Sequence, residues 1–240
     1  MKTPEKSKLT EMKDLLILGI DTSGKNASAA LYENGIFLAQ KSVLTSLTHS
    51  QIIMPMVNEL LESAKKDIND IDLFAAASGP GSYTGLRIGV SAVKALAFAT
   101  KKCCVGTSVL AGLCRAANPR NCDVLCVMKA RSNLAYAAMY SADNGVITQI
   151  MPDCITNIEQ LIDIASKSGR DLMITGDAAE NIIENIDNAN AYLSPKHLRI
   201  SNAMGVCLAA ADMKPAAPDE LMPSYFEITK AEKELNSKAV

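Results

Sequence analysis

The sequence lacks most of the side chains that enzymes and nucleic-acid-binding proteins rely on. Its 240 residues contain no Trp, 4% aromatic residues and only two histidines, His49 and His197. The formal net charge is −2, and no basic block follows the short N-terminal tail. Neutralisation of phosphates by basic side chains supplies most of the non-specific affinity for nucleic acid. The slightly negative net charge therefore argues against a subunit that binds RNA by itself. The two histidines are far apart in the sequence, so no histidine-pair metal site can be assembled locally.

Long hydrophobic runs and paired cysteine spacings are lacking too. No apolar run reaches the roughly 18 residues that a membrane-spanning helix needs. Residues 1–14 are charged, so we expect a disordered extension rather than a signal peptide. Seven cysteines, an odd number without the spacing of secreted domains, indicate reduced thiols that act as small buried hydrophobic groups. The sequence therefore predicts a cytoplasmic protein with no metal and no membrane contact.

Three strands and a helix open the chain. Asn34-Gly35 separates the last two strands and is a strong hairpin signal. An apolar stripe then predicts a helix that begins near Thr48, with a kink or a late start at Pro55. A short strand, a Gly-rich stretch and a second helix follow. The predicted strands of this βββαβα unit lie at residues 15–20, 27–32, 36–43 and 72–77.

The same order can be read again after residue 120. Asn144-Gly145 marks a second hairpin, and the predicted strands lie at residues 123–128, 134–140, 146–151 and 171–175. A duplicated βββαβα unit predicts an α/β, two-lobed actin/Hsp70/sugar-kinase-like (ribonuclease H-like) fold, with a single irregular α/β domain as the alternative. We expect the following division: extension 1–14, N-terminal lobe 15–107, C-terminal lobe 108–214 and C-terminal tail 215–240. The final helix of the second lobe can return to the first lobe.

The Gly-rich loop contains Gly79, Gly81 and Gly85 just before the second helix. Its backbone amides could cradle an anion, although no Gly-Lys-Ser/Thr ends it as in a Walker loop. The competing explanation is close approach to a neighbouring segment, which glycine alone permits. The helix that follows favours this second explanation.

That second helix is apolar around most of its circumference. Only one narrow polar stripe, formed by Arg87, Ser91 and Lys94, interrupts it. A helix packed on one sheet needs an apolar arc of only about 100°, so we expect part of this helix pair to face another protein. Deep burial inside a two-lobed fold is the alternative. The predicted interface residues are Ile53, Met56, Val57, Leu60, Leu86, Gly89, Val90 and Val93.

Four segments together carry a resemblance to a known family. They are residues 18–23, 48–50, 78–89 and 223–226. The chain resembles the TsaB (YeaZ) family of tRNA threonylcarbamoyladenosine biosynthesis proteins, which are non-catalytic relatives of TsaD in the glycoprotease-like family. The resemblance covers the first hundred residues well and the rest loosely. Tyr225-Phe226-Glu227 departs from the Tyr-Leu-Arg that is usual in that family.

The resemblance implies a scaffold or activator rather than an enzyme. Such a subunit binds a TsaD-like transferase, works with a TsaE-like ATPase and contacts tRNA only through the complex. It uses its two helices to dimerise when alone or to bind the transferase. No cofactor is expected in the isolated chain, whereas ATP or ADP at the partner interface is compatible with the resemblance.

The resemblance also implies a degenerate nucleotide cleft. Asp21, Thr22 and Ser23 follow a buried strand, either as a relic of a phosphate loop or as residues that only shape a turn. Lys129 stands where family members carry Asp, while Arg131 is retained and Gly176 matches a turn that contacts adenosine in active members.

The metal ligands of TsaD are missing as well, because Val109 and Leu113 occupy the positions of its two histidines. The alternatives are an autonomous ATP-dependent kinase or ATPase, favoured by Asp21 and the Gly-rich loop, and a metalloprotease, which lacks its ligands.

Overall fold

The computed structural model describes residues 15–44 and 47–226. The predictions for residues 1–14 and for the end of the tail, 227–240, lie outside the described residues. The first lobe contains β1 (Leu16–Asp21), β2 (Asn26–Glu33), β3 (Ile36–Leu44), α1 (His49–Ala64), η1 (Ile68–Asp70), β4 (Leu73–Gly79), α2 (Tyr83–Thr100) and β5 (Cys103–Ser108). As predicted, α1 begins after Thr48, whose backbone N–H donates to Gln51 Oε1. The late start considered at Pro55 does not occur, because α1 runs through this residue.

The second lobe repeats the pattern with shorter helices. It contains β6 (Cys122–Lys129), β7 (Leu134–Asp143), β8 (Val146–Asn157), α4 (Ile158–Ser166), β9 (Leu172–Thr175), α5 (Ala179–Ile183) and β10 (Ala191–Leu193). Helix α3 (Val109–Ala116) precedes this lobe, and η2 (Lys196–Leu198) and α6 (Ala203–Ala210) follow it.

The two sheets have the same strand order, which confirms the predicted duplication and the actin-like fold class. The first sheet is ordered β3-β2-β1-β4-β5 and the second β8-β7-β6-β9-β10. In each sheet the first two pairings are antiparallel and the last two are parallel. The strands β5 and β10 extend each sheet beyond the predicted six-element unit.

Both predicted hairpins have the same turn. Asn34 and Gly35 have φ angles of 53° and 84°, and Asn144 and Gly145 have φ angles of 51° and 82°. Two successive positive φ angles define a type I′ turn, whose twist matches that of the flanking strands. The Asn-Gly pair therefore sets both hairpins locally.

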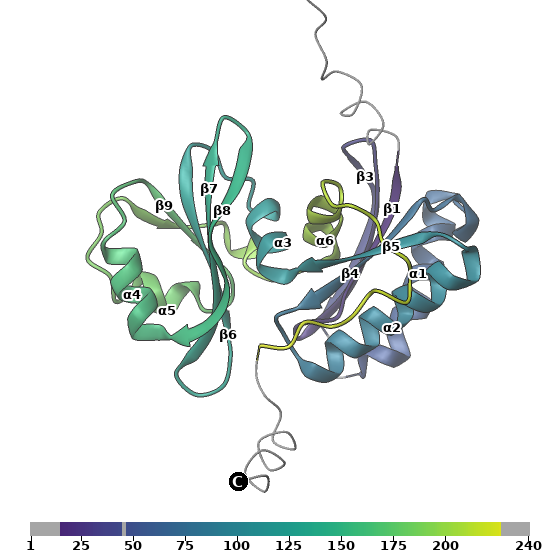
Figure 1. Ribbon diagram of the computed structural model, residues 1–240, viewed down its shortest axis with the longest axis horizontal. Coiled ribbons are helices and arrows are strands. Elements are labelled where there is room, and N and C mark those ends of the chain that lie inside the picture. Colours follow the sequence, from purple (N-terminus) through teal and green to yellow (C-terminus); the bar gives the residue numbers. More distant parts are fainter. Residues whose placement is uncertain (1–14, 45–46, 227–240) are drawn as a thin grey trace, which may run out of the picture.

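Five layers build the molecule (Figure 1). Helices α1 and α2 cover the outer face of the first sheet, α3 and α6 lie between the two sheets, and α4 and α5 cover the outer face of the second sheet. Three buried clusters fill the spaces between these layers. Among the described residues, no helix combines the length and apolar character that a bilayer crossing requires.

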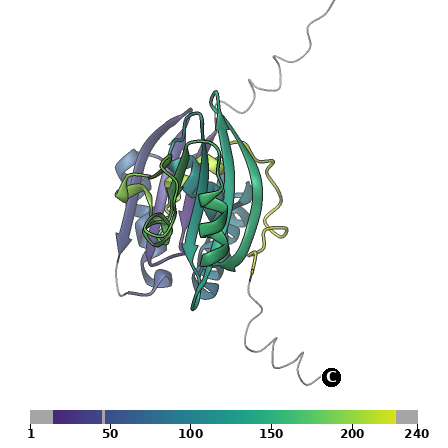
Figure 2. The same ribbon diagram turned by 90° about the vertical axis from the view of Figure 1, so that its left-hand side faces the viewer.

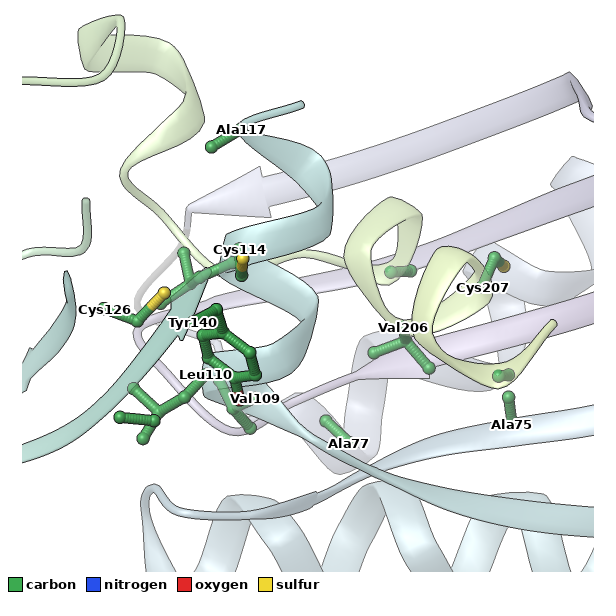
Figure 3. Packing of buried hydrophobic residues seen from close by; sticks show 14 of the residues in the cluster. Ala75, Ala77, Val109, Leu110, Cys114, Ala117, Cys126, Tyr140, Val206 and Cys207 are labelled. Atoms are coloured by element: carbon green, nitrogen blue, oxygen red, sulfur yellow. The ribbon is translucent and has the colours of Figure 1, made fainter. Parts of the chain in front are cut away.

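The middle layer joins the lobes through two small helices. Figure 3 shows Leu110 and Cys114 of α3 beside Cys126 and Tyr140 of the second sheet. Helix α6 contacts β1, β2, β4 and β5, so the helix assigned by sequence to the end of the second lobe packs on the first sheet.

The contact between α3 and α6 has no side chain at its closest point. A Cβ built on Gly205 would lie 2.5 Å from the carbonyl oxygen of Gly112. Only glycine allows two helix backbones to approach in this way.

The segment after α6 returns along the first lobe. Its residues 215–226, called here the C-terminal strap, follow one edge of the molecule (Figure 2). Cys104 of β5 and Ala216 exchange two backbone hydrogen bonds of 3.0 and 2.9 Å. Leu221 is 6% exposed and belongs to the same buried cluster as Val90 and Val93. The part of the predicted tail that the structure describes is thus packed on the first lobe.

Candidate functional site

The turn after β1 is buried and hydrogen-bonded to itself. Asp21, Thr22 and Ser23 are 1%, 1% and 2% exposed. Asp21 Oδ1 accepts hydrogen bonds from the Ser23 backbone N–H at 2.8 Å and from Ser23 Oγ at 2.6 Å. Thr22 Oγ1 donates to the carbonyl of Gly85 at 2.7 Å. These bonds match the interpretation of this segment as a structural turn.

The segment before α6 closes the space in front of this turn. Ser201 Oγ lies 3.4 Å from Ser23 Oγ, and Asn26 donates to the Ser201 carbonyl at 2.9 Å. The hollow that remains beside Asp21 has essentially no room for a water molecule. Burial raises the pKa of Asp21 above its ordinary value, although hydrogen bonds from Ser23 lower it in part. Asp21 is thus a buried carboxyl group that is hydrogen-bonded within its own turn.

His49 stands at the first position of α1. Its Nε2 atom donates to the carbonyl of Gly24 at 2.9 Å. Within the described ranges, no group of three or more His, Cys, Asp or Glu side chains is placed to hold a metal ion. Five of the seven cysteines are buried and all seven are free thiols.

The glycines of the Gly-rich loop allow close backbone contacts. A Cβ on Gly81 would lie 2.6 Å from the Ser23 carbonyl oxygen. A Cβ on Gly85 would overlap the carbonyl oxygen of Thr22. Gly79, with φ of 148°, abuts the Ser224 carbonyl of the strap. Close approach, rather than an anion cradle, therefore accounts for the three predicted loop glycines.

Two loop amides are used inside the protein as well. The Ser82 N–H donates to the Ser23 carbonyl at 2.8 Å, and the Gly85 N–H donates to Ser82 Oγ at 3.2 Å. Neither N–H is available to an anion.

The predicted cleft residues of the second lobe have different surroundings. Lys129 and Arg131 are exposed at the end of β6 and in the turn that follows. The Lys129 backbone N–H donates to Asp177 Oδ1 at 2.7 Å. Gly176, with φ of 109°, lies against the backbone of Val127, where a side chain would not fit. The structure thus buries the three first-lobe residues and exposes the two cations, so the predicted cleft is not an open pocket beside Asp21.

The residues predicted to form the interface are buried in the first lobe of this chain, which favours the alternative of burial within the fold. Each faces the sheet or the other helix, because their own lobe already covers the wide apolar arc of α2. Glycine at 89 brings α2 against Thr22 Oγ1, which a Cβ there would approach to 2.5 Å. The eight buried residues are Ile53, Met56, Val57, Leu60, Leu86, Gly89, Val90 and Val93.

The same two helices nevertheless present a groove to solvent. It is open, has a volume of about 520 Å³, and is apolar over most of its lining. Met54, 38% exposed, lies on the α1 side, and Ile88 and Ala92 lie on the α2 side. The full lining consists of Ser50, Ile53, Met54, Tyr83, Thr84, Arg87, Ile88, Ser91 and Ala92. Of the eight residues that the sequence predicted for an interface, Ile53 is the one that also lines this groove.

The polar stripe of α2 binds the C-terminal strap. Lys94 Nζ donates to the carbonyls of Leu221 at 3.0 Å and Asp219 at 3.4 Å. Arg87 Nε donates to the Tyr225 hydroxyl at 2.8 Å, and the Arg87 guanidinium lies 4.1 Å from the centre of the Tyr83 ring. Sequence reasoning noted the stripe but missed its partner, since nothing local links residues more than 100 positions apart.

Comparison with known proteins places these features in a family. The model of "TsaD: tRNA N6-adenosine threonylcarbamoyltransferase" matches residues 43–221. A "tRNA threonylcarbamoyladenosine biosynthesis protein TsaB" of Bacillus subtilis is 27% identical over 91% of this chain and 96% of its own length. The Escherichia coli protein of the same name is 35% identical over 54% of this chain and 57% of its own length. A Staphylococcus aureus tRNA N6-adenosine threonylcarbamoyltransferase is 34% identical over 42% of this chain and 34% of its own length.

Solved structures agree on the fold. YeaZ from Pseudomonas aeruginosa superposes with a TM-score of 0.73 at 24% identity and covers 88% of this chain and 99% of that one. A P. aeruginosa protein described as similar to peptidase YeaZ gives a TM-score of 0.76, also at 24% identity, over 89% of this chain and 100% of that one. The chain belongs to the TsaD family, as a homologue of its TsaB (YeaZ) members.

Proposed function

We propose that this chain is a non-catalytic subunit that binds a TsaD-like transferase and supports formation of threonylcarbamoyladenosine in tRNA. The reaction is inferred from the names of the related proteins. The observation that carries the non-catalytic role is the closed turn at Asp21, which leaves no space for a magnesium nucleotide in front of its buried carboxyl group.

The helix after β5 supports the same conclusion. Val109 and Leu113, at the positions where the transferase family carries its histidine pair, are 2% and 1% exposed and lie in the core between the lobes. Apolar side chains at these positions stabilise the middle layer and can ligate nothing. The position serves packing here instead of metal binding.

The groove between α1 and α2 is the proposed docking surface for the transferase. The family model of the transferase spans residues 43–221, which include both helices, so the partner is expected to carry an equivalent pair. Two related helix pairs can meet about an approximate two-fold axis as a four-helix bundle, with ridges of each in grooves of the other. In the absence of the transferase, a second copy of this chain would occupy the same surface and form a homodimer.

The remaining parts of the proposal concern the wider complex. A TsaE-like ATPase would join the pair, and ATP or ADP would bind at a subunit interface rather than in this chain alone. The net charge of −2 supports contact with tRNA only through the complex. The setting of this chemistry would be the cytoplasm.

One substitution in the groove tests the docking surface. Met54→Asp places a charge on an exposed position that lines the groove. We expect the affinity for the TsaD-like counterpart, measured by calorimetry, to fall by at least about tenfold, because a desolvated charge at an interface core costs more than a kcal/mol. The melting temperature should stay close to that of the parent.

Val146→Asp is the matched control. Val146 is 64% exposed and lies at the second-lobe hairpin, away from the groove. This variant should bind like the parent. Equal loss of affinity in both variants would contradict the assigned surface, and turnover of magnesium-ATP by the purified chain would contradict the non-catalytic role.

A further inference from the structure

The C-terminal strap ends at the mouth of the helical groove. After Leu221 enters the core of the first lobe, the Ser224 backbone N–H donates to the Ser78 carbonyl at 2.7 Å. The next residue, Tyr225, places its ring 4.7 Å from that of Tyr83, the first residue of α2. Tyr83 itself lines the groove.

The strap also positions the loop that leads into α2. The Ser224 carbonyl fills the space that a side chain on Gly79 would take. Ser82, at the other end of that loop, is the N-cap of α2 and accepts a hydrogen bond from the Gly85 N–H. Contacts of the strap at Ser78 and Gly79 therefore act on the residues that determine where α2 begins.

One side chain ties the strap to the groove wall. The Tyr225 hydroxyl accepts from Arg87 Nε, and the Arg87 guanidinium stacks on the Tyr83 ring. Arg87 and Tyr83 are two of the nine residues that line the groove. The aromatic and cationic end of the groove is thus built jointly by α2 and by a segment about 140 residues later in the chain.

We propose that the strap is a latch for the docking surface and that Tyr225 is its positioning residue. Tyr225 holds Tyr83 and Arg87 in one arrangement, so that the first turn of α2 is ordered before a partner arrives. Preorganisation of this kind raises affinity because fewer side chains lose conformational freedom on binding. The proposal rests on the proposed function for its partner, but the latch itself is a property of the free chain.

Two variants and one control test the latch. Tyr225→Ala removes both the ring contact and the hydroxyl, and we expect about a tenfold loss of affinity for the TsaD-like counterpart. Tyr225→Phe keeps the ring and should lose only about two- to threefold. Met222→Ala changes a strap side chain that is 67% exposed, and it should bind like the parent.

Hydrogen exchange of the free chain provides a readout that does not need the partner. In Tyr225→Ala, amides of residues 86–90 should exchange several-fold faster than in the parent, while those of β6 should not change. If the parent fails to bind any TsaD-like protein, the proposed function fails but the exchange result still tests the latch. Unchanged exchange at residues 86–90, or affinity of Tyr225→Ala equal to or tighter than that of the parent, would overturn the inference.

Discussion

The two lobes share one strand order but differ in the helices that cover it. Helices α1 and α2 of the first lobe have 16 and 18 residues, whereas α4 and α5 of the second have nine and five. Long helices leave exposed faces after their sheet is covered, and the first lobe has its groove on those faces. The two lobes thus carry the same sheet beneath helices of different length, and the groove between α1 and α2 lies on the longer pair.

The turns after the first strand of each lobe differ in a related way. The first-lobe turn is sealed, with Gly81 and Gly85 packed on its backbone. In the second lobe the position of Lys129 is exposed, and a backbone hydrogen bond to Asp177 holds it. Because the side chain at this position faces water and only the backbone makes the contact, a substitution that changes the charge does not unfold the lobe. This exposure explains how the position can carry the cation of Lys129.

The largest expected effect is the loss of stability when a charge is placed in the core of the first lobe. Val93 is fully buried, so Val93→Asp places an unpaired charge in the core. We expect a loss of about 4 kcal/mol or more in the free energy of unfolding, which is a large fraction of the stability of an average domain. Thermal denaturation measures this loss. Ala95→Asp, two residues along α2 at an exposed position, should change the melting temperature little; equal effects would mean that α2 is not oriented as described.

An intermediate effect is expected at the sealed turn. Gly85→Ala pushes a methyl group into the Thr22 carbonyl, and the backbone must shift to make room. We expect destabilisation of about 1–3 kcal/mol, measured by urea denaturation. Gly169→Ala is the control in the second lobe, where nothing lies within 4 Å of the added methyl group. Tolerance of alanine at position 85 would contradict the close approach of α2 to the turn.

The smallest effect concerns the ionisation of Asp21. Its pKa is raised in the folded protein, mainly by burial, so the unfolded chain loses this proton at lower pH than the folded chain. Stability should therefore fall as pH rises from about 4, the ordinary pKa of Asp, through the raised pKa of the folded state.

Asp21→Asn removes that dependence and keeps an oxygen that can accept from Ser23. The test is to measure the melting temperatures of the parent and the Asn variant from pH 4 to 8. We expect the melting temperature of the Asn variant to rise relative to that of the parent as the pH increases. A shift in the opposite direction would show that hydrogen bonds to the carboxylate outweigh its burial.

Local signals in the sequence predicted the fold well. Asn34-Gly35 and Asn144-Gly145 determine their turns through their own backbone preferences, so both hairpins and the duplication could be predicted. The burial of the predicted interface residues could not be predicted from such local signals. The apolar arc of α2 shows how much of the helix is covered but not by what, and Leu221 of the strap supplies part of that cover.

Contacts between distant segments could not be predicted in the same way. Arg87 and Tyr225 meet only because the chain passes through the second lobe and then returns past β5. Ser201, which closes the turn at Asp21, depends on the same return. The nature of the site, a sealed turn beside an open groove, is therefore a property of the assembled tertiary structure.

The glycine crossing between α3 and α6 has a mechanical meaning. In two-lobed proteins, a change in the angle between the lobes is absorbed by a few loop or element-terminal residues or by small sliding of packed helices. Here the backbones of α3 and α6 meet at Gly112 and Gly205, and a side chain added at Gly205 would force the two helices apart. The spacing of the two lobes therefore depends in part on two residues that carry no side chain.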